Sequence, residues 1–484
     1  YYDVPETIKG AGKLSGKTDT GLSYGILGAV TTLDDSSGWT NQLMKGKNRN
    51  YFVTRVKQDL FSGNSFIGLM STSSLADSAH TFSIDGMANL LDNQIGIDGQ
   101  IIMTLDGYKG NYGSISYSPL GFISGWMDFF QFEQGLKIND LGYLWRDDYS
   151  QIKVGLAFET FEPWNIVRNA SVILEGDTEK NSNGLDLGKT IELNFDLELN
   201  NSWGFGGGFF KIFEHYDDRK IIQDYNTSKF GSPIFIPEVT GSHFNIFTNK
   251  HQPLWASFSF TWASNTRDDT ERGRYAELTY RPNPYLSFST SFDSYLLNKQ
   301  YHWLESFLEY DGFHDIFSDL QREIKALTFR IIGNVNRRLS VQGYLEIYSN
   351  HDLYDQSTYS EYNVNGEYFD PLTDYILGTG EFWEDMPVYT DDESQLDASY
   401  LDPYLFLGLY PKYTSMILNG IVKWNYMKGS NIYFVYSYNK SVNGTPFNGI
   451  SEITDFLLFN DKQDWVEVLR DQTFMIKIDY WFEK

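Results

Sequence analysis

The 484-residue chain contains no cysteine and only 13 prolines. The lack of cysteine excludes disulfide scaffolds and metal sites with thiolate ligands. No stretch of the sequence approaches the ~18–20 consecutive apolar residues of a transmembrane helix. Cations are also scarce, since 38 Lys and Arg face 64 Asp and Glu, which gives a formal net charge of −26. The sequence shows no basic stripe, and because phosphate binding needs one, nucleic acid is excluded as a partner.

The N-terminus, Tyr-Tyr-Asp-Val-Pro, has neither a basic n-region nor an apolar h-region. We therefore expect any export signal to lie upstream of this sequence or to have been removed. No linker rich in Pro, Ser or Gly divides the chain, so residues 1–484 are expected to form a single domain. What the chain has in abundance is aromatic residues, which make up 17% of it.

Several segments alternate apolar and polar residues with a period of two. In the segment 190–199, the odd-numbered residues are Ile, Leu, Phe, Leu and Leu, and the residues between them are Glu, Asn, Asp and Glu. The same pattern recurs in 254–262, 286–293, 339–347 and 473–482. About ten alternating residues suffice for a β-strand that crosses a bilayer at a tilt. Soluble sandwiches and propellers alternate as well, so the pattern alone leaves both classes open.

The connections between these segments separate the two classes. Short turn signals stand at 18–21, 62–64, 92–93, 118–122, 162–165, 200–202, 249–253, 281–284, 336–338 and 428–430. Longer polar stretches lie between them, near 34–49, 137–148, 176–188, 217–240, 297–322, 350–411 and 443–471. Short periplasmic turns that alternate with long outer loops are typical of outer-membrane barrels. The sequence thus predicts an all-β, transmembrane, antiparallel up-and-down β-barrel of about 20–22 strands, with long acidic extracellular loops.

Tryptophans support the same orientation, because they stand beside the short turns or the last strand. An aromatic girdle at the inner membrane interface belongs at this position. The predicted periplasmic girdle consists of Trp164, Trp203, Trp255, Trp424 and Trp481. These features place the chain in the outer membrane of a Gram-negative bacterium. Its expected partners are outer-membrane lipid and lipopolysaccharide, together with other outer-membrane or surface proteins.

The opening hairpin also resembles a known family. Gly10-Ala-Gly-Lys-Leu-Ser-Gly-Lys-Thr18, followed by Gly21-Leu-Ser-Tyr-Gly-Ile-Leu-Gly-Ala-Val-Thr31, is similar to the start of a barrel family of Bacteroidota outer membranes. Arg55-Val-Lys-Gln-Asp59 and the ending Tyr480-Trp-Phe482 fit the same family. The resemblance implies a barrel of unassigned function that usually follows a β-sandwich similar to carbohydrate-binding modules. That sandwich is not in this sequence, so its sugar binding is not carried over, and Glu483-Lys484 depart from the usual aromatic ending.

Enzymatic chemistry finds little support in the sequence. The seven histidines are His80, His215, His243, His251, His302, His314 and His351. No nucleophile elbow, His-Glu-x-x-His motif or phosphate loop accompanies them. Adjacent His–Asp pairs such as His314-Asp315 are common by chance. The sequence therefore predicts no catalytic residues and no enzyme activity.

The segment 350–411 is the most acidic outer loop, and it has no Lys or Arg before Lys412. One interpretation is a solvated loop that keeps the protein soluble at the surface. A second is a Ca²⁺ site at Asp391, Asp392, Glu393 and Asp397, because hard cations bind several carboxylate oxygens. The spacing of these acids does not match a calcium loop. A loop of this length can also fold inward and occlude a lumen.

Acidic residues also occupy the polar register of the alternating segments. The predicted lumen-facing acids are Glu192, Asp196, Glu198, Asp293, Glu346 and Asp479. An acidic wall attracts cations and repels anions. The sequence therefore favours a porin-like channel or passive uptake pore that prefers cations. The alternative is a barrel occluded by its own loops that acts as a scaffold or subunit of a surface or envelope complex and binds protein or glycan.

Overall fold

The computed structural model describes residues 6–33, 48–75, 79–119, 121–136, 138, 142–160, 162–224, 229–309, 312–363, 412–443, 453, 456–457 and 466–480. The chain divides into two compact units. Unit 1 comprises residues 1–161 and 171–192, and unit 2 comprises residues 162–170 and 193–484.

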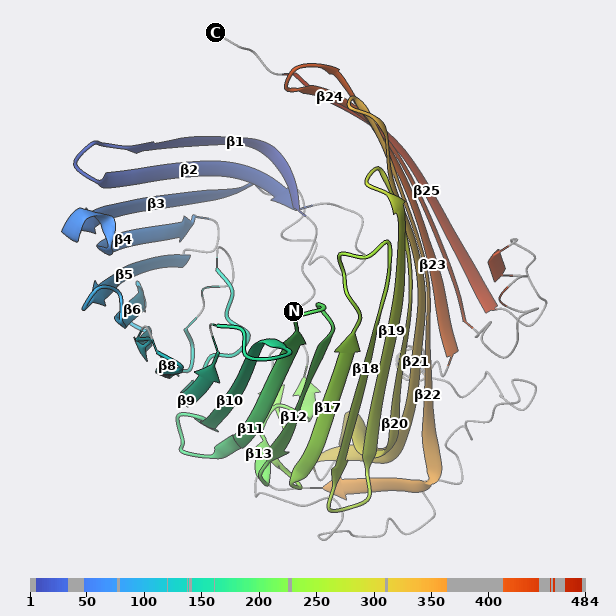
Figure 1. The fold of residues 1–484 in the computed structure, drawn as a ribbon. Coiled ribbons are helices and arrows are strands. Elements are labelled where there is room, and N and C mark those ends of the chain that lie inside the picture. The colour runs from blue at the N-terminus through green and yellow to red at the C-terminus, as the bar shows by residue number, and fades with distance from the viewer. Residues whose placement is uncertain are drawn as a thin grey trace. The chain divides into compact units, whose positions relative to one another are not determined.

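The described residues form one 21-stranded sheet and two sheets of two strands (Figure 1). The first strands are β1 (Glu6–Lys17), β2 (Leu22–Leu33), β3 (Asn48–Leu60), β4 (Ser65–Ser74), β5 (Ala79–Leu90), β6 (Ile95–Thr104), β7 (Lys109–Tyr117), β8 (Ile123–Phe132), β9 (Tyr149–Glu159), β10 (Val167–Lys180), β11 (Asp186–Leu199) and β12 (Gly204–Ile212), with a 3-10 turn η1 (Phe61–Gly63). Four short strands follow, β13 (His215–Asp217), β14 (Ile222–Asp224), β15 (Lys229–Phe230) and β16 (Ile234–Ile236). The last strands are β17 (Val239–Phe247), β18 (Leu254–Asn265), β19 (Thr270–Asn283), β20 (Leu286–Glu309), β21 (Gly312–Asn336), β22 (Leu339–Asn363), β23 (Lys412–Met427), β24 (Ser430–Asn443) and β25 (Val466–Asp479).

The large sheet is antiparallel and follows the order of the chain. Each strand from β2 to β10 pairs with the strand before it. The strand β17 pairs with β12, and each later strand to β25 again pairs with its predecessor. This confirms the prediction of an all-β, up-and-down antiparallel fold with 20–22 main strands. Within the described ranges, no helix is long and apolar enough to cross a membrane.

All the short turns that the sequence signals lie between consecutive strands of this sheet. The turn between β1 and β2 needs a glycine, because Gly21 has a φ of +83° and a Cβ there would stand 3.0 Å from the Cβ of Asp59. The turn between β5 and β6 uses Asp92 and Asn93, both at positive φ. Asp and Asn tolerate this conformation better than other residues with a Cβ.

Three predicted loops are wrong in whole or in part. The loop predicted at 350–411 starts too early, because β22 continues to Asn363. The stretch 176–188 is mostly strand, since β10 extends to Lys180 and β11 begins at Asp186. Polar side chains at its start are part of β10, where Asp177 and Glu179 stand opposite Lys153 and Gln151 of β9. The stretch 297–322 is also strand, because β20 and β21 continue to Glu309 and from Gly312. The sequence predicts loops in these stretches because they lose the apolar and polar alternation.

The two faces of the sheet differ in composition. In β9, the four apolar residues Ile152, Val154, Leu156 and Phe158 share one face and are each 40–48% exposed. Registered pairs extend this face across unit 1, for example from Leu69 to Ile84 and Ile101 and from Ile97 to Ile115 and Met127. In unit 2 the same kind of face carries Phe258, Leu278, Phe288, Phe329, Ile331 and Phe434, all of them exposed. We call this the apolar face and the opposite side the polar face.

Near the ends of the long strands, apolar side chains become buried. The four short strands β13–β16, here called the cap, bring Ile221 and Ile234 against Trp303 of β20 and Phe317 of β21. The Tyr301 ring also stacks on Phe317 at a centroid distance of 5.3 Å. A second cluster joins Ile347, Met416, Tyr438 and Val442 of β22–β24 to Phe456 of the following connection. Unit 2 therefore has a core at the ends of its strands and exposed apolar residues in their middle.

Candidate functional site

The polar face of unit 1 carries a row of carboxylates on β6–β10, here called the acidic ladder. It consists of Asp98, Asp128, Glu175, Asp177 and Glu179. The register sets Ser114 of β7 opposite both Asp98 and Asp128, and it sets Lys153 opposite both Asp128 and Asp177. Directly opposite residues of an antiparallel pair share a face. These side chains therefore line one continuous polar surface.

Other side chains compensate only part of the negative charge of the acidic ladder. The Lys153 Nζ atom lies 3.0 Å from Glu175 Oε1, and Gln151 Nε2 donates a hydrogen bond of 2.9 Å to Glu179. One lysine cannot balance several carboxylates, so the ladder keeps a negative excess. A surface of this kind attracts cations from water.

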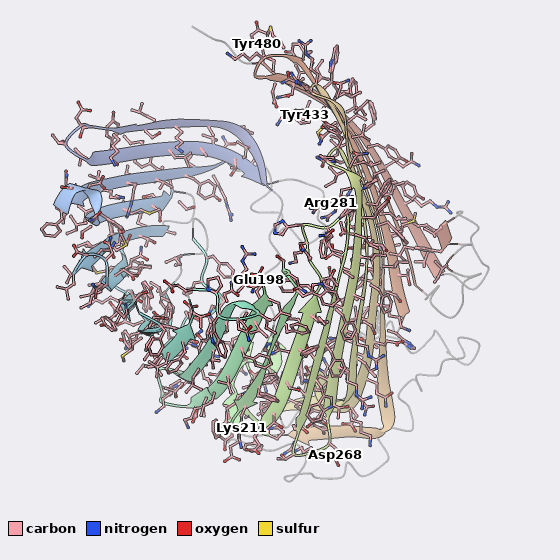
Figure 2. The ribbon with its side chains drawn as sticks, viewed as in Figure 1. Glu198, Lys211, Asp268, Arg281, Tyr433 and Tyr480 are labelled. Carbon is pink, nitrogen blue, oxygen red and sulfur yellow. The ribbon has the colours of Figure 1, made fainter. Side chains whose placement is uncertain are left out.

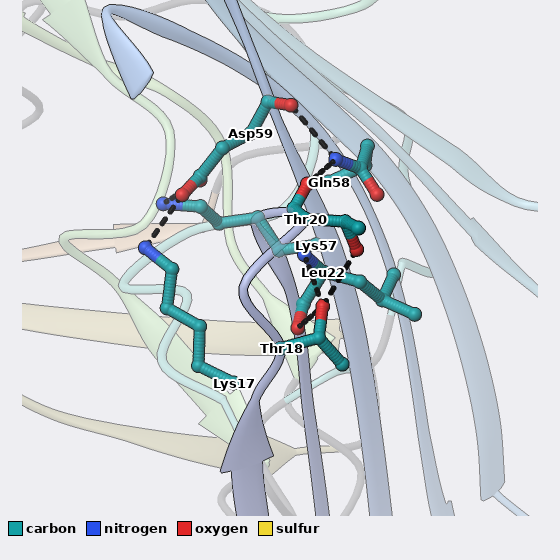
Figure 3. Close-up of polar contacts among 7 residues, drawn as sticks. All are labelled: Lys17, Thr18, Thr20, Leu22, Lys57, Gln58 and Asp59. Carbon is teal, nitrogen blue, oxygen red and sulfur yellow. Dashed lines mark hydrogen bonds and ion pairs between the residues drawn. The ribbon is translucent and has the colours of Figure 1, made fainter. Parts of the chain in front are cut away.

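The polar face of β1 and β3 carries the opposite charge. Here the register gathers Lys13, Lys17, Arg55 and Lys57, which we call the basic strip. Lys17 and Lys57 share Asp59, with Nζ to carboxylate distances of 2.6 and 3.4 Å (Figure 3). Arg55 forms a two-bonded ion pair with Asp85 of β5, and the bond from Nη2 to Oδ2 is 2.6 Å long.

Sequence reasoning missed the basic strip. Its cations are spread over residues 13–57 with other residues between them, so no local run signals it. The spacing of two within Arg55-Val-Lys57, and of four between Lys13 and Lys17, does place each pair on one face of a strand. The pairing of β1 and β3 on either side of β2 is what brings the two pairs together.

In unit 2 the polar face combines carboxylates with hydroxyl groups. Tyr275 Oη and Thr279 Oγ1 donate hydrogen bonds of 3.1 and 3.2 Å to Glu277. Tyr344 Oη likewise donates to Glu346, and the Arg330 guanidinium lies 5.3 Å from the Tyr344 ring centroid. Such a surface holds its acids in place mainly through neutral hydroxyl donors.

The two ends of unit 2 are distinct in Figure 2. Lys211 and Asp268 lie at one end, whereas Arg281 and Tyr433 lie towards the other, beside short turns. The first end also holds a cavity of about 110 Å³ between the cap and β18–β21, lined by Asp269, Arg267 and Tyr301 among others. Asp269 accepts a hydrogen bond of 2.6 Å from Asn265, and burial raises the pKa of its carboxyl to about 6.

Residues 4–375 match a protein-family model whose description is "Domain of unknown function (DUF5916)". The chain belongs to this family. A search of curated proteins finds no match.

Two solved structures are similar to this DUF5916 chain at a low level. One is the FrpB iron transporter from Neisseria meningitidis in its F5-1 variant apoprotein form, with 8% identity and a TM-score of 0.37 over 89% of this chain and 73% of that chain. The other is the F3-3 variant of FrpB, with 7% identity and a TM-score of 0.35 over 89% and 74%. At these TM-scores the likeness supports no inference about this chain.

The six acids that the sequence assigns to a lumen all lie on the polar side of their strands. Glu198 receives hydrogen bonds of 2.9 Å from Arg168 and 3.3 Å from Asn169. Asp293 stands opposite Tyr275, and Asp479 lies 3.4 Å from Lys477. The remaining three are Glu192 and Asp196 in β11 and Glu346 in β22. Three of the six thus lie on β11 and the others on β20, β22 and β25, so the structure does not gather them into one site, and their contact with a lumen stays a prediction.

The predicted girdle tryptophans differ in environment. Trp164, Trp203 and Trp424 are exposed, whereas Trp255 is only 9% exposed, with Lys250 5.5 Å from its ring centroid. Trp255 shares the polar side of β18 with Ser257 and Ser259, so the alternation itself could have separated it from the others. Trp481 and the predicted calcium ligands Asp391, Asp392, Glu393 and Asp397 lie outside the described residues. Within the described part of the chain, no group of three or more His, Asp or Glu is placed to hold a metal ion.

Proposed function

We propose that the protein is an outer-membrane β-barrel that acts as a channel or passive uptake pore. The observation that carries this proposal is the distribution of side chains between the two faces. In a water-soluble sheet the apolar face is covered, whereas here Ile84, Leu156 and Phe329 are 53, 48 and 43% exposed. Large exposed apolar surfaces mark contact with a membrane or a partner. A face that spans most strands of the sheet fits lipid better than it fits one partner.

Strand length supports a bilayer as the surrounding medium. The strands β4–β9 have 9–12 residues. About 9–11 tilted residues cross a hydrocarbon core. The polar face then borders water, and the proposed location is the outer membrane of a Gram-negative bacterium of the Bacteroidota. Outer-membrane lipid and lipopolysaccharide are the proposed partners of the apolar face.

Cation preference follows from the charges on the polar face. Few Lys or Arg side chains pair with the carboxylates of this face. These carboxylates are the acidic ladder in unit 1 and Glu277, Asp293 and Glu346 in unit 2. Carboxylates near a narrow aqueous path lower the entry energy of cations and raise that of anions. The net charge of −26 acts in the same direction. The proposed solutes are therefore small cations or neutral molecules, and no catalytic step is proposed.

A second candidate function is a closed scaffold that presents folded outer segments to a protein or glycan. The cap favours this candidate, because its Ile221 and Ile234 are buried against Trp303 and Phe317. A segment with its own core can act as a rigid docking surface. In this case the barrel wall anchors the cap and transports nothing.

Conductance of the purified protein in planar bilayers decides between the two candidates. The channel proposal predicts stable openings and, in a tenfold KCl gradient, a reversal potential of the sign expected for cations. Openings with an anion-selective reversal potential would contradict the cation preference. Silence in the intact protein, followed by openings after residues 366–409 are replaced by a short Gly-Ser linker, would support the closed scaffold.

A further inference from the structure

The polar face of unit 1 separates its charges into two regions. The basic strip occupies β1 and β3, and the acidic ladder occupies β6–β10. The chain as a whole has 64 acidic and 38 basic side chains. A local excess of cations on two strands is therefore the reverse of what the composition predicts.

The basic strip keeps uncompensated positive charge. Arg55 is matched by Asp85, and Asp59 matches one of the two lysines Lys17 and Lys57. Lys13 is exposed and makes no ion pair with any residue in the described ranges. One of the two lysines that share Asp59, together with Lys13, therefore remains available.

Beside its donor groups, the basic strip also has unfilled space above the backbone of Gly25. One registered row joins Ser15, Gly25 and Arg55, so the Gly25 backbone lies between β1 and β3 on this face. A Cβ on Gly25 would meet no atom within 4 Å. The Ser15 hydroxyl lies on the same face as Lys13 and Lys17, two residues from each. A small oxyanion seated over Gly25 would meet ammonium groups and a hydroxyl donor, which are the groups that bind such anions.

Distance prevents the acidic ladder from neutralising the strip. Strands in a sheet are ~4.7–4.9 Å apart, so β3 and β6 are separated by roughly 14 Å along the sheet. This exceeds the Debye length of about 8 Å at physiological ionic strength. The two regions therefore act as separate electrostatic environments on one face.

We propose that the basic strip is a binding site for small solutes that carry a carboxylate or phosphate group. The proposal deepens the proposed function, because it rests on the polar face being in contact with water. The site concerns the binding of anions on two strands, and it leaves the cation preference proposed for the pore unchanged. Phosphate and carboxylate solutes share the same oxyanion chemistry, and the experiment below separates them.

The absence of cysteine allows a direct test in the purified full-length protein. Ser15→Cys places one thiol in the strip, and Ser114→Cys places one in the acidic ladder. Each variant is treated with an anionic and with a cationic methanethiosulfonate reagent, and the ratio of the two rates is compared. We expect this ratio to favour the anionic reagent at position 15 by at least about tenfold over position 114, because surface potentials of several kT act on both reagents. Equal ratios at the two positions would overturn the proposal.

Binding is tested by protection of the thiol at position 15. Inorganic phosphate or acetate should slow the anionic reagent with a saturable concentration dependence, beyond the effect of NaCl at equal ionic strength. Lys13→Gln combined with Lys57→Gln should remove this protection, whereas Lys153→Gln in the ladder should leave it intact. Protection by phosphate alone would restrict the site to phosphate solutes, and protection no stronger than that of NaCl would overturn it.

Conductance is recorded on the same preparations, so that failure of either idea is distinguishable. A protein that is silent in bilayers but shows saturable protection at position 15 contradicts the channel and supports the anion site. A protein that conducts but shows no saturable protection at position 15 supports the channel and contradicts the anion site.

Discussion

Strand β21 carries two phenylalanines in opposite environments. Phe329 lies in the middle of the strand on the apolar face and is 43% exposed. Phe317, near the strand end that the cap covers, here called the outer end, is 1% exposed. The same side chain in the same strand is therefore uncovered in one place and part of a core in the other. Strand length alone does not show which part of a strand crosses the proposed membrane. The edge of the membrane is instead indicated by the position along the strand at which apolar side chains change from exposed to buried.

Backbone irregularities mark this change. The pairing of β20 with β21 shifts between Leu297 and Gln300, and Lys299 has a φ of +61°. A bulge bends a strand and changes its twist. Beyond it, the strands leave the alternating pattern and meet the cap. The middle of the strands is thus built for contact with an apolar medium and the outer end for contact with protein.

The largest expected effect comes from removing the buried phenylalanine. Phe317→Ala should destabilise the outer end of unit 2 by about 3–5 kcal/mol, because it leaves a cavity in the core. Phe329→Ala is the matched control, and it should cost about 1 kcal/mol, because only part of its surface is transferred. Hydrogen exchange should accelerate in residues 215–224 and 229–236 for Phe317→Ala alone. Equal effects of the two changes would remove the distinction between the two regions.

A charge on the apolar face should have the next largest effect. Leu156→Arg in the middle of β9 should cost about 2–4 kcal/mol of stability in a bilayer. Gln151→Arg, on the polar face of the same strand, should cost less than about 1 kcal/mol, since it can still pair with Glu179. Urea unfolding in lipid vesicles, followed by tryptophan fluorescence, measures both changes. If the two variants unfold alike, the assignment of the apolar face to lipid is wrong.

The outer end should also respond to pH through Asp269, in the turn between β18 and β19. Burial raises the pKa of this carboxyl from 3.8 to about 6, with Asn265 and Arg267 opposing the shift and Asp319 and Asp268 adding to it. The folded state therefore holds its proton more tightly than the unfolded state. Stability should fall by about 1–2 kcal/mol as the pH rises from the unfolded pKa of 3.8 through the folded pKa of about 6, and stay level at higher pH. Hydrogen exchange of residues 262–272 measures this, and Asp269→Asn should abolish the dependence.

An effect of similar size is expected in the turn between β1 and β2 of unit 1. Gly21→Ala should cost about 1–2 kcal/mol, because the turn needs a positive φ and the new Cβ would press on Asp59. Gly25→Ala serves as the control, since a Cβ there meets open space, and it should change stability by less than about 0.5 kcal/mol. A loss at Gly25 as large as that at Gly21 would show that the turn conformation is not the cause.

Much of the fold could be predicted from the sequence, because period-two alternation is a local signal. The strands around Thr190–Leu199 and the turn at Asp92–Asn93 follow directly from neighbouring residues. The outer halves of β20 and β21 could not be predicted, since a strand covered by other protein no longer alternates. Their burial beneath the cap depends on residues such as Ile221, which lie about eighty positions away in the chain.

The candidate site was predictable only in part. Acids such as Asp293 and Glu346 follow from the polar register of a single strand, so the sequence indicates their face. The basic strip depends on the pairing of β1 and β3 with β2, which no single strand reveals. Trp255 is buried, unlike the other described tryptophans of the predicted girdle. Its position near a turn predicts a place in the girdle, but proximity to a turn does not fix the side of the sheet on which a ring lies.

The central claim is that the apolar face meets lipid and the polar face meets water. It is tested most directly by single cysteines at positions 151, 152, 153, 154, 156 and 158 of β9, labelled with a membrane-impermeant maleimide in intact vesicles. Gly155 and Ala157 are left out, because a Cβ at Gly155 would overlap the Trp126 ring and Ala157 is only 4% exposed. Strong labelling is expected at Gln151 and Lys153 and weak labelling at the four apolar positions. Uniform labelling, or stronger labelling at Ile152, Val154, Leu156 and Phe158, would contradict the account.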